Sequence, residues 1–137
     1  MGESTEEQLR LGFDARVRVE FRGSNISSDA GLLAYRELDE RLGLSALAPR
    51  YLTEKRTGRN LQQHLVPLLR QSVYSRLAGY PDTNDADRLA HDPALRLVVS
   101  RQASEKRAAA RTTVGCFETE LLASEENRQG LAAFNAI

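Results

Sequence analysis

The densest group of side chains able to do chemistry lies within residues 82–92. It contains four carboxylates and one histidine: Asp82, Asp85, Asp87, Asp92 and His91. Carboxylate oxygens suit magnesium or manganese, so a metal-dependent hydrolase is one interpretation. The spacing of these residues argues against a metal site. The segment lacks the central glycine and terminal glutamate of a calcium loop, and Asp85 and Asp87 would point to different sides of a helix. We favour structural roles, with Asp82 and Asp92 as helix caps and the other two carboxylates near a helix N-terminus.

The other candidate nucleophiles and metal ligands are isolated in the sequence. His64 has no second histidine or cysteine at ligand spacing, and Cys116, the single cysteine, excludes a disulfide within the chain. The sequence contains no glycine-rich phosphate loop, nucleophile elbow or zinc-binding spacing. The residues by themselves therefore predict no catalytic group, metal site or cofactor in this chain.

Basic side chains gather in two blocks of a chain whose formal net charge is zero. Residues 41–80 carry seven Lys and Arg against one Asp or Glu, and residues 96–111 carry five against one. Such groups can neutralise DNA phosphates. The predicted nucleic-acid-binding residues are Lys55, Arg56, Arg59, Arg70, Arg76, Arg101, Lys106 and Arg107. The alternative is a surface of salt bridges to the acidic blocks.

The first half of the chain contains one predicted strand and two predicted helices. Residues 16–21 alternate polar and apolar side chains, which indicates a strand whose partner must come from residues 9–13, another chain or sequence beyond Ile137. A helix is expected from residue 29 to Gly43, after an N-cap in residues 27–29. The predicted outer face of this helix carries Arg36, Glu37, Asp39, Glu40 and Arg41.

A linker is expected around Pro49 and residues 57–58, followed by a helix over residues 60–78. In that helix Pro67 predicts a kink or a start at Val66, and Gly79 predicts the end. Two short helices are expected over residues 85–90 and 93–99, then a polar, solvent-facing connection over residues 100–111, then helices over residues 114–122 and 125–134. The predicted fold class is mainly α, a helical domain of about five to six helices with one short N-terminal strand or hairpin.

Length and composition bound the function classes. A chain of 137 residues with 41% hydrophobic and 28% charged residues is typical of one compact soluble domain. Residues 1–15 form an acidic lead to the helical domain of residues 16–137. The sequence has no apolar run long enough for a membrane span and no basic, apolar leader, so a cytoplasmic protein is expected. Without tryptophan and with 6% aromatic residues, a base-stacking platform for single strands is disfavoured.

Three blocks of the sequence carry a family resemblance. The first block has ISSDAGLL at residues 26–33 and RELDERLGL at residues 36–44. The second block includes NDADRL at 84–89 and HDPAL at 91–95. The third block has FETE at 117–120 and ASEEN at 123–127. In this order they resemble bacterial insertion-sequence transposases of the DDE transposase group 1 family. The resemblance covers about residues 17–130.

The resemblance implies a transposase that binds terminal inverted repeats of double-stranded DNA and uses Mg2+ or Mn2+ held by three carboxylates on a ribonuclease-H-like domain. It places the first catalytic aspartate downstream of the third block. The aspartates that match no catalytic position are Asp29, Asp39, Asp82, Asp85, Asp87 and Asp92.

We therefore expect an N-terminal region of a transposase that lacks the ribonuclease-H-like domain and is inactive alone as a nuclease. It would bind DNA ends or associate with another copy or a full-length transposase. The alternative is a protein-interaction or dimerisation fragment that does not bind DNA itself.

Overall fold

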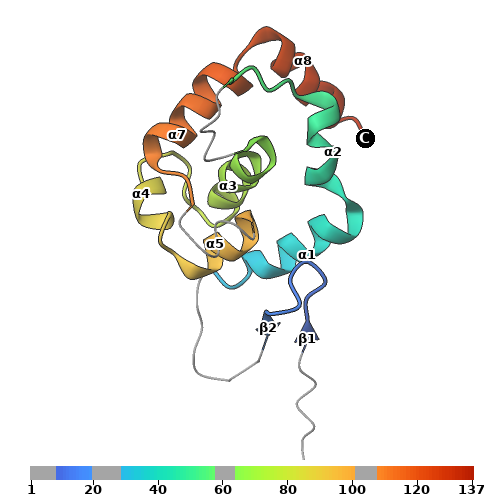
Figure 1. The fold of residues 1–137 in the computed structure, drawn as a ribbon, viewed down its shortest axis with the longest axis vertical. Coiled ribbons are helices and arrows are strands. Elements are labelled where there is room, and N and C mark those ends of the chain that lie inside the picture. Colours follow the sequence, from blue (N-terminus) through green and yellow to red (C-terminus); the bar gives the residue numbers. More distant parts are fainter. Residues whose placement is uncertain (1–8, 20–28, 58–63, 101–107) are drawn as a thin grey trace, which may run out of the picture.

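The computed structural model describes residues 9–19, 29–57, 64–100 and 108–137. Its elements are β1 (Leu9–Arg10), β2 (Arg18–Val19), α1 (Leu32–Leu42), α2 (Leu44–Tyr51), α3 (Leu65–Leu77), α4 (Ala86–Leu89), α5 (Pro93–Val99), α7 (Arg111–Cys116), the π-helix η1 (Phe117–Leu122) and α8 (Glu125–Phe134). The described part is mainly helical, which confirms the predicted fold class. Figure 1 shows α3 at the centre, with the other helices arranged around it.

The N-terminal strand pairs within the chain. β1 and β2 are antiparallel, with Leu9 opposite Val19 and Arg10 opposite Arg18. The connecting turn is held by Asp14, whose backbone oxygen accepts from Val17 N at 3.0 Å. Of the three sources considered for the partner strand, residues 9–13 supply it, so this pairing requires no second chain.

Helix α1 begins at Leu32, and its N-cap is Gly31 without a side-chain hydrogen bond, so the predicted start at residue 29 is wrong and Asp29 is not the cap. Residues 27 and 28, the other predicted cap positions, lie outside the described residues. The helix turns a face to the core that differs from the predicted one. It ends at Gly43, whose φ of 67° is a left-handed conformation that favours glycine. Of the apolar residues at helical spacing on α1, Leu32 is buried and Leu33 is partly buried against a core cluster, whereas Tyr35, Leu38 and Leu42 are exposed. Arg36 and Asp39 are buried instead, so their assignment to the outer face is wrong. Asp39 is buried because donors from two other helices satisfy its carboxylate.

The linker predicted around Pro49 and residues 57–58 is helical at Pro49, where the prediction is wrong, whereas residues 52–57 form neither helix nor strand. Helix α2 follows directly after Gly43 and includes Pro49 near its end. The missing N–H of Pro49 removes one hydrogen bond from the helix, while the neighbouring Ala48 is fully buried in a core cluster. Leu52 N donates to Ala48 O at 2.9 Å and ends the helix.

Helix α3 runs through the centre of the fold and contributes to both parts of the core. It begins at Leu65, so Pro67 lies in the first turn, where its missing N–H costs little. This agrees with the predicted late start, and residues 60–63 lie outside the described residues. The helix ends before Gly79, whose φ is 93°. Leu68 packs in one core cluster and Tyr74 in the other.

The helix predicted over residues 114–122 begins three residues earlier, at Arg111, and consists of α7 followed by the π-helix η1. Two other late helices begin at their predicted caps. Asp92 caps α5 as predicted, because its carboxylate accepts from Leu95 N at 2.9 Å. Ser124 caps α8 in the same way, accepting from Asn127 N at 3.4 Å. Asn127 is 1% exposed and joins α8 to the segment after α2, since its side chain accepts from Thr53 N and donates to Thr53 O.

The connection over residues 100–111 is not solvent-facing throughout, which corrects the prediction for its end. Residues 101–107 lie outside the described residues, but Ala108 and Ala109 are 1% and 2% exposed. The buried amide of Gln71 accepts from Ala109 N at 2.9 Å and donates to Ala109 O at 2.7 Å. Small side chains allow the backbone to approach α3, and Gln71 satisfies its polar groups.

Candidate nucleic-acid interface and a buried ion cluster

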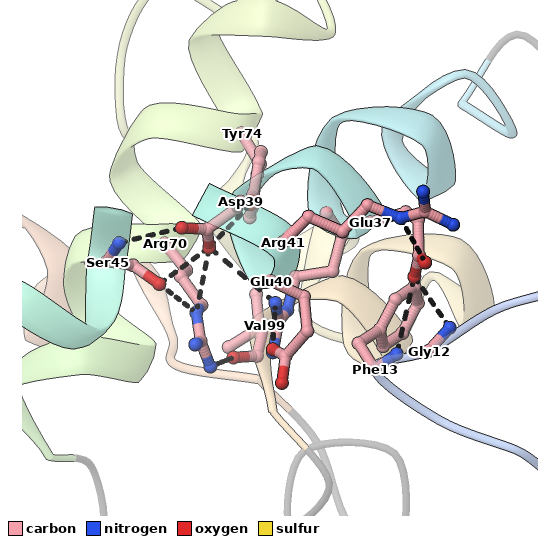
Figure 2. Close-up of polar contacts among 11 residues, drawn as sticks. Gly12, Phe13, Glu37, Asp39, Glu40, Arg41, Ser45, Arg70, Tyr74 and Val99 are labelled. Carbon is pink, nitrogen blue, oxygen red and sulfur yellow. Dashed lines mark hydrogen bonds and ion pairs between the residues drawn. The ribbon is translucent and has the colours of Figure 1, made fainter. Parts of the chain in front are cut away.

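A buried ion cluster joins α1, α2 and α3 around the carboxylate of Asp39, and Figure 2 shows its contacts. Ser45 N donates to Oδ1 at 2.7 Å, and Ser45 Oγ donates to Oδ2 at 2.6 Å. Tyr74 donates its phenol hydrogen to Oδ2 at 3.1 Å. Arg70 Nε lies 3.5 Å from Oδ2, and Arg36 NH1 lies 3.7 Å from it. One carboxylate thereby binds groups from all three helices.

The cluster sets the charge states of its members. Burial by itself raises the pKa of Asp39, but hydrogen bonds from Ser45 and Tyr74 and the charge of Arg70 outweigh it, so the pKa lies below its ordinary value of 3.8. Burial and the nearby Asp39 carboxylate raise the pKa of Tyr74, which keeps the phenol protonated as a donor. Burial and the charge of Arg36 lower the pKa of Arg70, an arginine that still remains charged at neutral pH.

A second carboxylate of α1 holds the N-terminal hairpin. Glu37 Oε2 accepts from Gly12 N at 2.7 Å and from Phe13 N at 3.3 Å, and its Oε1 pairs with Arg41 at 3.1 Å, as the helical spacing predicts. Burial by itself raises the pKa of Glu37, but these hydrogen bonds outweigh it and lower the pKa. Arg36 lies over the ring of Phe13 at 5.0 Å, so the hairpin also covers one side of the ion cluster.

Arg70, a predicted DNA contact, is part of the buried ion cluster. Its side chain is 15% exposed, and Nε donates to Ser45 Oγ at 2.8 Å while NH1 donates to Val99 O at 3.4 Å. These partners occupy the guanidinium on the side that faces Asp39.

Arg76 lies nearly two turns further along α3 and pairs with η1. Its NH1 donates to Glu118 Oε1 at 2.7 Å, and NH2 donates to Oε2 at 2.9 Å, a two-bond contact between planar groups. The hydrogen bond from Arg76 lowers the pKa of Glu118 in spite of partial burial, with a further contribution from Ser72. The Arg76 side chain remains 47% exposed beside this pair.

Lys55 and Arg56 lie together in the segment after α2, where they line a cavity of about 400 Å3 with Phe117. Lys55 Nζ is 2.8 Å from Glu126 Oε2, and the two side chains are 63% and 54% exposed. Arg56 Nε donates to Glu54 Oε1 at 2.8 Å, and the guanidinium lies 6.0 Å from the ring centre of Phe117. The structure thus brings two of the predicted residues together.

The remaining predicted nucleic-acid-binding residues are outside the described part of the chain. They are Arg59, Arg101, Lys106 and Arg107. Each of the four described members, in contrast, has a carboxylate within ion-pair distance.

The carboxylates of residues 82–92 have separate structural partners. Asp82 accepts from Asn84 N at 2.8 Å in the turn before α4, so its predicted role as a helix cap is wrong, since the N-cap of α4 is Asp85. Asp85 pairs with Arg88 at 3.4 Å, and Asp87 accepts from Arg111 N at 2.8 Å. Asp92 caps α5. Over residues 9–19, 29–57, 64–100 and 108–137, no three His, Cys, Asp or Glu side chains gather in a way that could hold a metal ion.

Sequence reasoning missed the Asp39 cluster because its members are far apart in the chain. Asp39 and Tyr74 are separated by 35 positions, and only the packing of the helices brings them together. The one local signal is the spacing of Asp39 and Ser45 across Gly43, which places a donor at the start of the next helix.

The fold and the polar contacts define a helical domain with surface cations and, among its described residues, without a metal centre. A comparison with protein families identifies the class: the model described as transposase DDE domain group 1 matches residues 9–136. The chain belongs to this family, which supports a function in transposition. No curated protein and no solved structure matches the chain.

Two further expectations of the family can be compared with the described residues. DDE transposases use divalent metal ions, but the described carboxylates of this chain do not form a fitting site, so we derive no metal-dependent step from them. Among the described helices, none is long and apolar enough to cross a membrane.

Proposed function

We propose that the chain serves in DNA transposition by binding the terminal inverted repeats of its element as double-stranded DNA. Membership of the transposase DDE family over residues 9–136 carries this proposal. The proposal includes a cytoplasmic location, because the DNA of a bacterial element is there. It also includes catalytic incompleteness for DNA cleavage. The described residues bind and position the DNA, and cleavage requires carboxylates beyond these residues.

Within this proposal, Lys55 and Arg56 are the described residues that contact phosphate. Lys55 is 63% exposed, and an exposed ion pair such as Lys55 with Glu126 is worth about 0–1 kcal/mol, so a DNA phosphate can replace the carboxylate at small cost. The ring of Phe117 lies under Arg56 and fixes its guanidinium near the surface.

Arg76 serves as an exposed accessory contact to a DNA phosphate. Arg70 does not contact DNA but stabilises the fold. The Arg70 side chain is 15% exposed and has Asp39, Ser45 and Val99 as partners, so moving it to a phosphate would leave Asp39 with fewer cations. Arg59, Arg101, Lys106 and Arg107 remain proposed phosphate contacts from the sequence alone.

A salt series tests the DNA proposal. Binding of the chain to a fluorescent duplex carrying the terminal inverted repeat is compared with binding to a scrambled duplex. We expect preference for the repeat and a negative slope of log K against log salt concentration. Replacing Lys55 and Arg56 by Gln should weaken binding to both duplexes and reduce the slope by about 1 for each phosphate that is no longer neutralised.

The matched control is Arg88→Gln, because Arg88 has the same 63% side-chain exposure as Lys55 and also pairs with a carboxylate. This variant should retain the wild-type slope. Equal effects of both changes would show a nonspecific charge effect, and a folded chain without affinity for either duplex would disprove DNA binding. Cleavage of the duplex by the chain alone in Mg2+ or Mn2+ would disprove catalytic incompleteness.

The alternative of a protein-interaction fragment that does not bind DNA is weakened in one respect. An unpaired strand would favour strand-mediated association, but β2 pairs with β1 in the same chain. The observation that favours association is a different one, an apolar groove lined by α1, α2 and α3.

A further inference from the structure

An open cavity of about 450 Å3 lies between the N-terminal hairpin and helices α1, α3 and α5. Among the described residues, Arg70 is the one that it shares with the lining of the apolar groove. Its charged lining residues are Asp14, Arg16, Arg36 and Arg70. Three positive charges therefore face one negative charge across this cavity.

Arg36 and Arg70 form a buried cationic wall of the cavity. Their side chains are 9% and 15% exposed, and they lie 3.7 Å and 3.5 Å from the same oxygen, Asp39 Oδ2. Glu40 pairs with Arg36 at 2.8 Å. Neither Asp39 nor Glu40 lines the cavity. The two guanidinium groups are thus held beside each other by carboxylates that lie outside the cavity, so a ligand would not have to order them.

Both guanidinium groups keep hydrogen-bond donors that the fold does not use. Arg36 NH1 is buried and makes no hydrogen bond, although Glu40 Oε2 lies 2.8 Å from it. The hydrogen bonds of Arg70 use Nε and NH1, which leaves the two hydrogens of NH2. Buried donors nearly always have an acceptor in native proteins, so an unused donor at a cavity points to a bound group.

Charge and shape select a phosphate group as this acceptor. A guanidinium binds phosphate oxygens through two parallel N–H bonds, and two adjacent arginines suit an anion with more than two oxygens. A phosphate monoester offers three such oxygens and a charge of about −1.5 to −2 near neutral pH. The carboxylate in the lining, Asp14, is bonded to Arg16 at 3.0 Å and 2.7 Å, and this pairing reduces its repulsion of an anion.

The rest of the cavity suits the organic part of a small molecule. The apolar lining side chains are Phe13, Ala15 and Leu97, and the ring of Phe13 lies 5.0 Å from the Arg36 guanidinium. The volume of about 450 Å3 lies in the range of small-molecule sites. A phosphate of duplex DNA is flanked by sugars and does not reach guanidinium groups that are 9% and 15% exposed.

We propose that this cavity binds a small phosphomonoester. Arg36 and Arg70 donate to its phosphate group, and Phe13, Ala15 and Leu97 contact its organic part. The inference goes beyond the proposed DNA binding and does not rest on it, because Lys55 and Arg56 line a different cavity. Because the hairpin and three helices line the site, the ligand also stabilises the folded chain.

Calorimetric titration of the purified chain without DNA tests this proposal. The probes are inorganic phosphate, glycerol 3-phosphate, adenosine 5′-monophosphate and adenosine, at constant ionic strength. We expect at least one of the two monoesters to bind more tightly than inorganic phosphate, and adenosine not to bind. Binding of inorganic phosphate alone would overturn the monoester and leave the free ion as the occupant.

Ala15→Glu places a carboxylate at an exposed position of the lining. It should raise the dissociation constant of each phosphate compound roughly 10-fold or more, because like charges repel. The matched control is Ala123→Glu, which adds the same charge at an exposed position outside the cavity and should bind like the wild type. Arg36→Lys keeps the charge but loses the planar fork, so it should also weaken binding.

Circular dichroism establishes that each variant is folded. If Arg36→Lys fails to fold, the comparison of the two alanine positions decides. A folded wild type that binds none of the phosphate compounds up to about 10 mM would overturn the proposal. So would equal losses in Ala15→Glu and Ala123→Glu. Displacement of the monoester by a duplex without terminal phosphates would assign the cavity to DNA and overturn the small ligand. Failure of the titrations leaves the salt series on DNA unaffected.

Discussion

The phenol of Tyr74 on α3 donates a hydrogen bond of 3.1 Å to the carboxylate of Asp39 on α1. Both residues also line the apolar groove, together with Ser45 and Arg70. The cluster that orients α1 therefore borders the surface that this orientation exposes. A change in the cluster is expected to alter both the stability of the domain and the shape of the groove.

Replacing Asp39 by Asn should lower the free energy of unfolding by about 2–4 kcal/mol, because Arg70 would lose its anion in a buried site and Arg36 would be left with the half-exposed Glu40 at 2.8 Å. Urea unfolding measures the change. The control Asp85→Asn alters an ion pair whose carboxylate side chain is 44% exposed, and it should cost less than about 1 kcal/mol. Equal costs would mean that the cluster contributes no more than a surface pair.

The stabilising effect of Asp39 should depend on pH in one direction. Its pKa is lower in the folded chain than the ordinary 3.8, so its contribution is complete above pH 3.8 and disappears as the pH falls through the folded value. The difference in unfolding free energy between wild type and Asp39→Asn should therefore be constant near neutral pH and shrink in this acid range. A difference that grows on acidification would contradict the depressed pKa.

Replacing Gln71 by Ala should destabilise the domain by about 2–4 kcal/mol, because the backbone N–H and C=O of Ala109 would be left buried without partners. Amide hydrogen exchange should show faster exchange at Ala109 in the variant. The matched control is Gln129→Ala on the exposed side of α8, where Gln129 bonds to Glu125 at 3.0 Å, and its effect should stay within about 0.5 kcal/mol.

Replacing Gly130 by Ala should separate α8 from α2. A Cβ at this position would lie 1.9 Å from the backbone oxygen of Tyr51, so the helices must move apart, at a cost of about 2–4 kcal/mol. Gly31→Ala is the control, since nothing lies within 4 Å of its Cβ position and its φ of −58° suits alanine. Thermal unfolding should show a loss for Gly130→Ala and little change or a small gain for Gly31→Ala.

The positions of the helices could be predicted where their signals are local. Gly43, Asp92 and Ser124 mark helix ends through backbone conformation or capping, and these features act within a few residues. The sequence did not reveal helix α2, because Pro49 is a local signal against a helix, whereas the packing of Ala48 in a core cluster with distant residues is not visible in the local sequence.

The candidate site was less predictable. The sequence identifies Lys55, Arg56, Arg70 and Arg76 as a basic group, but charge alone does not tell which cation has a buried partner. Arg70 and Arg76 differ by six positions on one helix, yet one joins Asp39 and the other Glu118. Their partners lie 31 and 42 positions away in the chain, so only packing assigns them.

The sequence by itself determined the mainly helical class, several of the residues at which helices begin or end, and the resemblance to DDE transposases. Periodicity, capping and motif order can all be recognised along the chain without knowledge of its packing. The tertiary structure decided which face of α1 is buried. An amphipathic stripe ordinarily turns inward, but Asp39 gains donors from α2 and α3 that satisfy its charge, so Arg36 and Asp39 face the core. Tyr35, Leu38 and Leu42 lie on another face of the same helix and are exposed.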